Sequence, residues 1–217
     1  MKTAVVMLLA VSAAAFGEDA PATMTKLMVK LESPEIPKDS FAAQPKRIYR
    51  ASARYCRTEE NPDPENGIHG LMIVNEPDIW MINRLDNSAR HIVDEGPTFN
   101  CRMPIFATNE DVKSAADVDK PVMQLEFGRE LEYFRPRSKA PTAGPVLQGK
   151  ATRVYTVDDG GWQLFLFTGG DPEAPVSVVR KNDKTREILW YGEYEQLPFD
   201  AKLFARPEGV KIEEMKQ

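Results

Sequence analysis

The sequence contains few of the residues that build catalytic and metal-binding motifs. It has two histidines and two cysteines in 217 residues. It contains no Gly-rich phosphate loop, no G-x-S-x-G motif, no H-E-x-x-H motif and no C-x-x-C motif. The histidines and cysteines also lack the spacing of a metal site. We therefore expect a protein that is not an enzyme and that uses no cofactor and no metal ion.

Long hydrophobic runs and clustered positive charge are also missing. The net charge is −5, with both signs spread along the chain, whereas a nucleic-acid-binding protein needs a basic face. The apolar run at residues 4–16 is too short to span a bilayer and matches a secretory signal peptide, with Ala15 and Gly17 at the small positions before the cleavage site. We expect no nucleic-acid partner and no stable membrane insertion.

The rest of the chain shows no Gly/Ser-rich linker, so residues 18–217 are expected to form one domain after a signal peptide at residues 1–17. Such a protein would be periplasmic or secreted. Export would place Cys56 and Cys101 in an oxidising compartment, where a disulfide can form. The sequence leaves two alternatives open, a disulfide that closes a long loop or two separately buried thiols. It does not indicate the oligomeric state.

Residues 67–106 predict consecutive antiparallel strands. Residues 71–75, 79–85 and 89–93 are apolar or β-prone, and the turn-forming sequences EPD and DNS separate them. Placing the turns at Pro77 and Asn87 pairs Leu71 with Asn83, and Asn83 with His91.

Alternating segments flank this region. Residues 27–31 predict a half-buried strand, and residues 47–57 predict one strand with its arginines facing solvent. Residues 109–127 are expected to be mostly helical, and the Pro-rich residues 135–149 to form a surface loop. Four further strands follow, separated by turns rich in Gly, Asp and Asn, at residues 152–157, 162–167, 176–180 and 187–194. The fold class is therefore mainly β, with a curved antiparallel sheet.

Two groups of polar residues are candidates for chemistry. The predicted register brings His69, His91 and Asp94 near one another. They form either a small metal or acid–base site or, as the simpler interpretation, solvent-facing positions on a sheet. Carboxylates such as Glu193 and Glu195 are interpreted as solvated positions on a strand, although a glycosidase pair depends on the fold and not on sequence spacing.

Two patches of sequence resemble a known family. GLMIVNEPDIWMIN, then HIVDEG and MPIF, and the tail LPFDAKLFARPEGVKIEE are similar to segments of the bacterial periplasmic lipoprotein carriers, the LolA/LolB-like family. The resemblance implies an unclosed antiparallel β-barrel with short helices as a lid and an apolar interior that holds acyl chains. It implies neither a cofactor nor catalysis.

On this basis we expect an exported, non-catalytic binding protein for a lipid, a lipoprotein or another apolar ligand in the cell envelope. The residues expected to line the apolar cavity are Trp80, Leu164, Leu166, Trp190 and Tyr194. Two alternatives stay open. The first is a structural or interaction protein whose barrel is filled by side chains, and the second is a hydrolase with a site on the concave sheet face.

Overall fold

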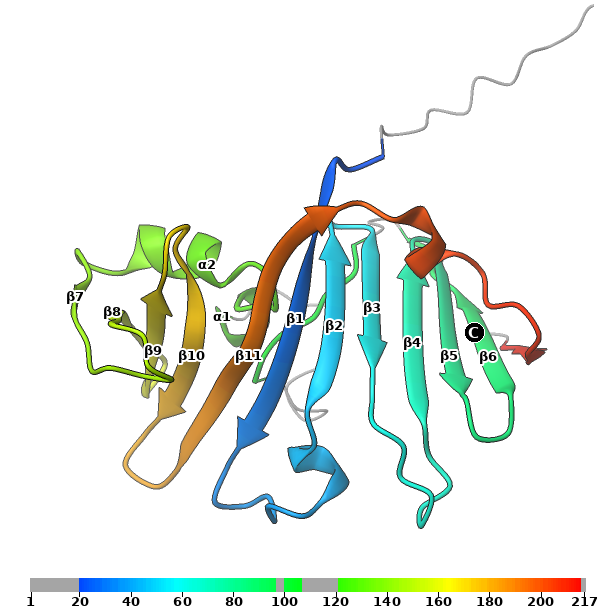
Figure 1. Ribbon diagram of the computed structural model, residues 1–217, viewed down its shortest axis with the longest axis horizontal. Coiled ribbons are helices and arrows are strands. Elements are labelled where there is room, and N and C mark those ends of the chain that lie inside the picture. The colour runs from blue at the N-terminus through cyan, green and yellow to red at the C-terminus, as the bar shows by residue number, and fades with distance from the viewer. Residues whose placement is uncertain (1–19, 97–99, 107–120, 216–217) are drawn as a thin grey trace, which may run out of the picture.

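The chain folds around one open sheet of 12 strands, shown in Figure 1. The computed structural model describes residues 20–96, 100–106 and 121–215. The strands are β1 (Thr23–Glu32), β2 (Lys46–Ala51), β3 (Tyr55–Glu59), β4 (Gly70–Asn75), β5 (Asp78–Asn83), β6 (Ser88–Val93), β7 (Thr142–Ala143), β8 (Arg153–Asp159), β9 (Trp162–Gly169), β10 (Ala174–Lys181), β11 (Arg186–Pro198) and β12 (Lys211–Glu214). The helices are α1 (Pro121–Gln124) and α2 (Glu130–Arg137), with 3-10 turns η1 (Phe41–Ala43) and η3 (Ala201–Phe204).

The sheet order follows from consecutive hairpins on either side of β1. The order is β12-β6-β5-β4-β3-β2-β1-β11-β10-β9-β8-β7, and β1 pairs antiparallel with both β2 and β11. The sheet curves but does not close, so the predicted fold class, a mainly β protein with an open antiparallel barrel, is confirmed. The strands expected within residues 67–106 and 152–194 are present as β4–β6 and β8–β11.

One strand departs from the antiparallel pattern. After β11 the chain crosses to the far edge of the sheet and adds β12, which pairs parallel with β6 (Figure 1). This arrangement places the end of the described chain beside the middle of the sequence. The wall that β12 adds to the sheet is important for the site described below.

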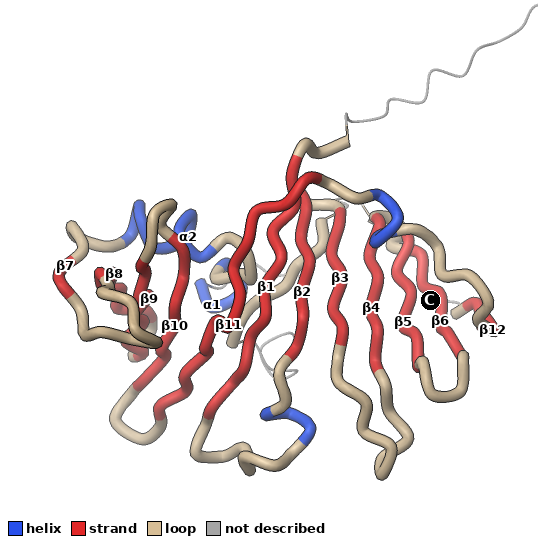
Figure 2. The backbone as a smooth tube through the Cα atoms, in the orientation of Figure 1, coloured by secondary structure: helices blue, strands red, loops and turns tan. Residues whose placement is uncertain are grey.

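The two faces of the sheet carry different cover. We call the face on which α1 and α2 pack the inner face, and the opposite face the outer face. In the half formed by β1 and β8–β11, the inner face is filled by a core that includes Leu166, Val178 and Leu189 from the sheet and Tyr133 and Phe134 from α2. Figure 2 shows α1 behind β11 in this half of the molecule.

The outer face is covered near β2–β6 by the C-terminal segment. Leu71, Ile73, Trp80, Ile82 and Ala89 form a buried cluster there, and two residues from the end of the chain, at positions 210 and 212, pack against it. The side chains of η3 and its neighbours bury a second, smaller cluster around Phe204. The apolar side chains of β4 and β5 on the outer face are therefore already buried by the C-terminal segment.

Residues 47–57 form two strands and not the single strand that was predicted. β2 ends at Ala51 and β3 begins at Tyr55, and Ser52 adopts a positive φ of 53° in the turn between them. The turn contains no Gly, Pro, Asn or Asp, and its one turn-favouring residue is Ser52, whose Oγ accepts a hydrogen bond from the Arg54 amide at 3.2 Å. The prediction that the arginines of this segment face solvent is wrong for Arg50, which is 4% exposed.

The segment after residue 106 also differs from the prediction. Residues 107–120, which include most of the expected helix, lie outside the described residues, and α1 is helical only over Pro121–Gln124. The expected loop at residues 135–149 begins inside α2, which continues to Arg137 with Pro136 in its last turn. It also contains the two-residue strand β7.

The predicted register is wrong by one residue between β4 and β5 and by three residues between β5 and β6. Asn83 pairs with Gly70 and with Ser88, and His91 pairs with Trp80. A shift by an odd number moves a side chain to the other face of the sheet. This correction decides which residues form the site.

Candidate binding groove

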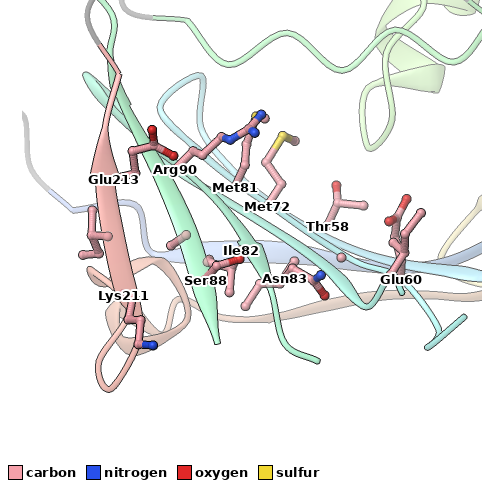
Figure 3. A pocket seen from close by; sticks show the side chains of 15 residues that line it. Thr58, Glu60, Met72, Met81, Ile82, Asn83, Ser88, Arg90, Lys211 and Glu213 are labelled. Carbon is pink, nitrogen blue, oxygen red and sulfur yellow. The ribbon is translucent and has the colours of Figure 1, made fainter. Parts of the chain in front are cut away.

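Within the described residues, the inner face of β3–β6 and β12 is left open beyond Cys56 and Val74, which belong to the core. One row of side chains crosses these strands in register: Thr58 pairs with Met72, Met72 with Met81, Met81 with Arg90, and Arg90 with Glu213. Figure 3 shows the side chains of Met72, Met81 and Arg90 close together on this surface. The row is apolar in its middle and charged at the β12 end.

A second, more polar row runs beside the first. It consists of Glu60, Gly70, Asn83, Ser88 and Lys211, joined by strand pairing and by the hydrogen bond from the Glu60 amide to the Gly70 carbonyl. A Cβ at Gly70 would lie 2.2 Å from Glu60 Oε2, so glycine leaves the space in which the Glu60 side chain lies. These two rows and Ile68 line a groove of about 960 Å³, which we call the inner-face groove. The lining also includes four residues of the outer-face cluster: Leu71, Ile82, Ala89 and Ile212.

Asn83 fixes the end of the groove nearest Ile68. Its Oδ1 accepts hydrogen bonds from the amides of His69 and Leu85, and its Nδ2 donates to the Gly67 carbonyl at 2.8 Å. These bonds hold the loop before β4 against β5. They place Ile68, which is 39% exposed, on the lining of the groove.

The apolar floor of the groove follows from the pattern of β5. Trp80 and Ile82 are buried on the outer face, so Met81 between them must point inward, where it is 44% exposed. Met72 of β4 lies directly beside it and is partly buried. An exposed apolar floor on a sheet whose other face is already covered is typical of a binding surface.

Charge in the groove is distributed unevenly. Glu60 at one end is neutralised by Lys46, with Nζ 2.8 Å from Oε1. Arg90 and Lys211 at the other end are exposed, and neither forms an ion pair within residues 20–96, 100–106 and 121–215. Glu213 lies opposite Arg90 in the register but is not ion-paired with it in that part of the chain. The β12 end of the groove is therefore cationic.

A histidine clasp on the outer face holds β12 in place. His91 Nε2 lies 2.7 Å from Asp78 Oδ1, and Nδ1 lies 2.5 Å from Glu214 Oε2. The imidazole also stacks on Trp80, with ring centroids 5.4 Å apart. Burial lowers the pKa of His91, but the two carboxylates outweigh it, so the pKa is raised above its ordinary value. The clasp stabilises the wall that completes the groove.

The comparisons with known proteins add little beyond the fold. No protein-family model matches the chain, and no curated protein sequence matches it. Among solved structures, an uncharacterized conserved protein from Thermus thermophilus is 12% identical, with a TM-score of 0.46 over 89% of this chain and 91% of that one. LprF from Mycobacterium bovis is 10% identical, with a TM-score of 0.40 over 79% of this chain and 85% of that one.

A LolA superfamily protein, NE2245 from Nitrosomonas europaea, is also among the similar structures. It is 7% identical, with a TM-score of 0.35 over 87% of this chain and 92% of that one. These similarities are too low to assign a family or a function. The groove must therefore be interpreted from its own residues.

Of the five residues predicted to line one cavity, the structure brings Leu164, Leu166 and Tyr194 together at the filled core but places Trp80 and Trp190 elsewhere. Trp80 belongs to the outer-face cluster, and Leu164 and Leu166 are buried in the filled inner core under α2. The Trp190 indole donates to Glu32 Oε2 at 3.0 Å, and Tyr194 packs beside the filled core. None of the five lines the inner-face groove. The odd-numbered shift in register explains why Trp80 lies on the outer face. The packing of α2 explains why Leu164 and Leu166 are buried in a filled core instead of lining a cavity.

Tyr194 contacts a buried carboxylate. Glu130 of α2 is fully buried and accepts hydrogen bonds from the Tyr191 hydroxyl at 2.7 Å and the Tyr194 hydroxyl at 3.3 Å. Burial raises the pKa of Glu130, although these hydroxyls and the Gly128 amide favour the charged form. The group lies inside the filled half and fastens α2 to β11.

The other candidates for chemistry are also separated. His91 contacts Asp78 and Glu214, whereas His69 donates its amide to Asn83, so the expected cluster of His69, His91 and Asp94 does not form. No group of three histidine, cysteine, aspartate or glutamate residues within the described chain is arranged to hold a metal ion. In the same residues, no helix has the length and apolar character needed to cross a membrane.

The two cysteines are joined by a disulfide. Cys56 of β3 and Cys101 are bonded, with their Cα atoms 6.3 Å apart. Both are buried in the core next to Arg50, whose Nη2 donates to the Cys101 carbonyl at 3.2 Å. Of the two alternatives left open by the sequence, the structure has the disulfide.

Proposed function

We propose that this protein is an exported, non-catalytic binding protein for an amphiphile, and that the hydrocarbon chain of the ligand lies in the inner-face groove. The observation that supports this best is the neighbouring pair of exposed Met81 and partly buried Met72 on a sheet whose outer face is already covered. Methionine suits such a floor because its flexible thioether adapts to ligands of different shape.

The size of the groove agrees with this function. Ligand pockets have volumes of about 300–1,000 Å³, and the groove, at about 960 Å³, is near the upper end of that range. Burial of apolar area contributes about 25 cal/mol per Å², so an alkyl chain gains free energy along its whole length on the methionine floor. An apolar ligand without a polar head would leave Arg90 and Lys211 unused.

Export is part of the proposal. Residues 1–17 have the pattern of a signal peptide, and the disulfide between Cys56 and Cys101 supports an oxidising compartment, periplasmic or extracellular. In that setting the protein would shield the chain of a lipid, or of a lipid-modified protein, from water.

A second candidate function is supported by the other half of the sheet. The inner face under α2 is filled by side chains, as expected for a structural or interaction protein with a packed barrel. The two functions differ in what happens at the groove, because only the binding protein needs Met72 and Met81 to contact a ligand.

The test is a titration with the neutral apolar fluorophore N-phenylnaphthylamine, whose emission rises in an apolar site. We expect saturable binding to the wild-type protein, and binding at least tenfold weaker to Met81→Asp, since the change removes apolar floor and adds a carboxylate. Because Met81 is half-exposed, the thermal midpoint should stay close to that of the wild type.

The matched control is Val146→Asp, which replaces a side chain that is 70% exposed and lies outside the groove. It should bind the probe like the wild type. If the wild-type protein gives no saturable signal, or if both variants bind equally well, the binding function is wrong and the packed-barrel alternative is favoured.

A further inference from the structure

The cationic end of the groove suggests the chemical class of the ligand. Arg90 and Lys211 come from neighbouring strands, β6 and β12, and are diagonal to each other in the register, because Lys211 pairs with Ser88 and Glu213 with Arg90. Both cations are exposed and both line the groove. In Figure 3 the side chain of Arg90 is directed toward Met81 and that of Lys211 toward the opposite rim, so the two cations lie on either side of this end of the groove.

The residues that line this end of the groove carry one more positive charge than negative, and Asp86, which lies outside the lining, also interacts electrostatically with Lys211. Arg90 and Lys211 supply two positive charges and Glu213 supplies one negative charge. At the opposite end, Glu60 is paired with Lys46 at 2.8 Å and leaves no net charge. A ligand with one negative charge would complete the balance.

The apolar floor extends away from the cations. In the first row, Arg90 is followed by Met81, then Met72, then Thr58, on four successive strands. Neighbouring strands are about 4.8 Å apart, so three steps give an apolar path of roughly 14 Å from β6 to β3. Figure 3 shows Arg90 beside Met81 and Met72 at one side of this surface.

We propose that the occupant of the groove is a single-chain amphiphile with a carboxylate head, that is, a long-chain fatty carboxylate. The carboxylate pairs with the guanidinium of Arg90, and the chain lies across Met81 and Met72 toward Thr58. The ammonium of Lys211 adds positive potential at the same end of the groove without contacting the carboxylate. The planar guanidinium matches a carboxylate with two parallel hydrogen bonds, which gives the head group a fixed position. This inference rests on the proposed function, because it needs a chain in the groove.

The experiment compares ligands with the same chain and different heads. Dodecanoate, dodecylphosphate, monolauroyl glycerol and dodecyltrimethylammonium are titrated into the purified protein by calorimetry, below the concentration at which each forms micelles. We expect dodecanoate to bind at least tenfold more tightly than the neutral glycerol ester and the cationic amphiphile, and more tightly than the doubly charged phosphate.

Substitutions assign the effect to the two cations. Arg90→Gln should weaken dodecanoate binding about tenfold, because it removes hydrogen bonds between two charged groups, which contribute more to the binding free energy than hydrogen bonds between neutral groups. Lys211→Gln should weaken it by a smaller factor, and both variants should bind monolauroyl glycerol like the wild type. Arg206→Gln is the matched control, since Arg206 is exposed and lies outside the groove.

The outcomes separate this inference from the function on which it rests. If monolauroyl glycerol and dodecanoate bind with equal affinity, and Arg90→Gln changes neither, the carboxylate assignment is wrong while the groove still binds a chain. Preference for dodecylphosphate or for the cationic amphiphile also overturns the carboxylate assignment. If none of the four ligands binds, the inference and the proposed function fail together.

Discussion

The buried arginine of β2 permits a quantitative prediction. Arg50 points to the inner face, and its Nη2 lies 2.6 Å from Glu126 Oε2. Its guanidinium also donates to the carbonyls of Phe127 at 3.0 Å and Cys101 at 3.2 Å. Arg50 thus fastens the segments on both sides of residues 107–120 to the sheet. We expect the substitution Arg50→Met, which keeps the apolar stem and removes these donors, to destabilise the fold strongly.

The expected loss follows from the burial of both charges, since the side chains of Arg50 and Glu126 are each 3% exposed. Removing one member of a buried ion pair costs about 3–5 kcal/mol. Glu126 would keep Arg102, whose Nη1 lies 3.3 Å from Glu126 Oε1, so its buried charge would be only partly compensated. Each kcal/mol shifts the melting temperature by about 2–4 °C for a chain of this size, so we expect a decrease of roughly 6–20 °C.

The assay is urea unfolding followed by circular dichroism, together with a thermal melt. The control is Arg47→Met on the same strand, because Arg47 is 40% exposed and lies 3.5 Å from Glu59, so that pair should contribute at most about 1 kcal/mol. The double variant Arg50→Met with Glu126→Leu should regain part of the loss. If Arg50→Met is no less stable than Arg47→Met, the buried pair does not hold the inner segments as described.

Three further predictions concern stability. Replacing Cys56 and Cys101 by alanine opens a link across 45 residues and should cost about 4 kcal/mol of unfolding free energy; two free thiols in the denatured, unreduced wild type would contradict this. The raised pKa of His91 means that its clasp stabilises the fold fully below about pH 6.5 and loses this effect as pH rises through the raised value. His91→Gln should therefore flatten the fall in stability above pH 6.5, and an unchanged slope would show that the clasp does not act. The raised pKa of Glu130 means that its contribution is full below about pH 4.3 and is lost as pH rises through the folded pKa. Glu130→Gln should reduce the difference in urea midpoint between pH 4 and pH 7, and an equal difference in both proteins would refute the assignment.

The strands were predictable where short turns separate them. Pro77 and Asn87 mark the turns around β5, and Gly and Asn/Asp pairs mark those between β8 and β11, because these residues favour turn conformations. The turn at Ser52 was not predicted, since a single serine within an alternating segment is a weak turn signal.

The groove was missed because the register was set wrongly. The structure pairs Asn83 with Ser88, three residues from the predicted partner His91. With the predicted register, Met72 and Met81 lie on different rows, and Arg90 is not their neighbour. The exposed methionine between the two buried residues Trp80 and Ile82 was the available signal, because a strand with apolar residues on both faces needs a partner on each.

The buried polar groups could not be predicted from local sequence. Glu130 and its partner Tyr191 are separated by 61 residues, and Arg50 and the Phe127 carbonyl by 77. Nothing near Arg50 in the sequence indicates which face will be covered by a segment so distant. The alternation of β2 therefore gave the strand correctly but not the direction in which Arg50 points.

Ligand binding in the inner-face groove can be observed by a methyl NMR titration of protein labelled at its methionine methyl groups, with dodecanoate as the ligand. The account predicts that the resonances of Met72 and Met81, assigned by substitution, shift together and saturate at the same ligand concentration. Those of Met103 and Met123, which are buried in the described structure, should stay in place. Shifts at Met103 and Met123 with none at Met72 and Met81 would place the ligand in the filled half of the barrel and contradict the account.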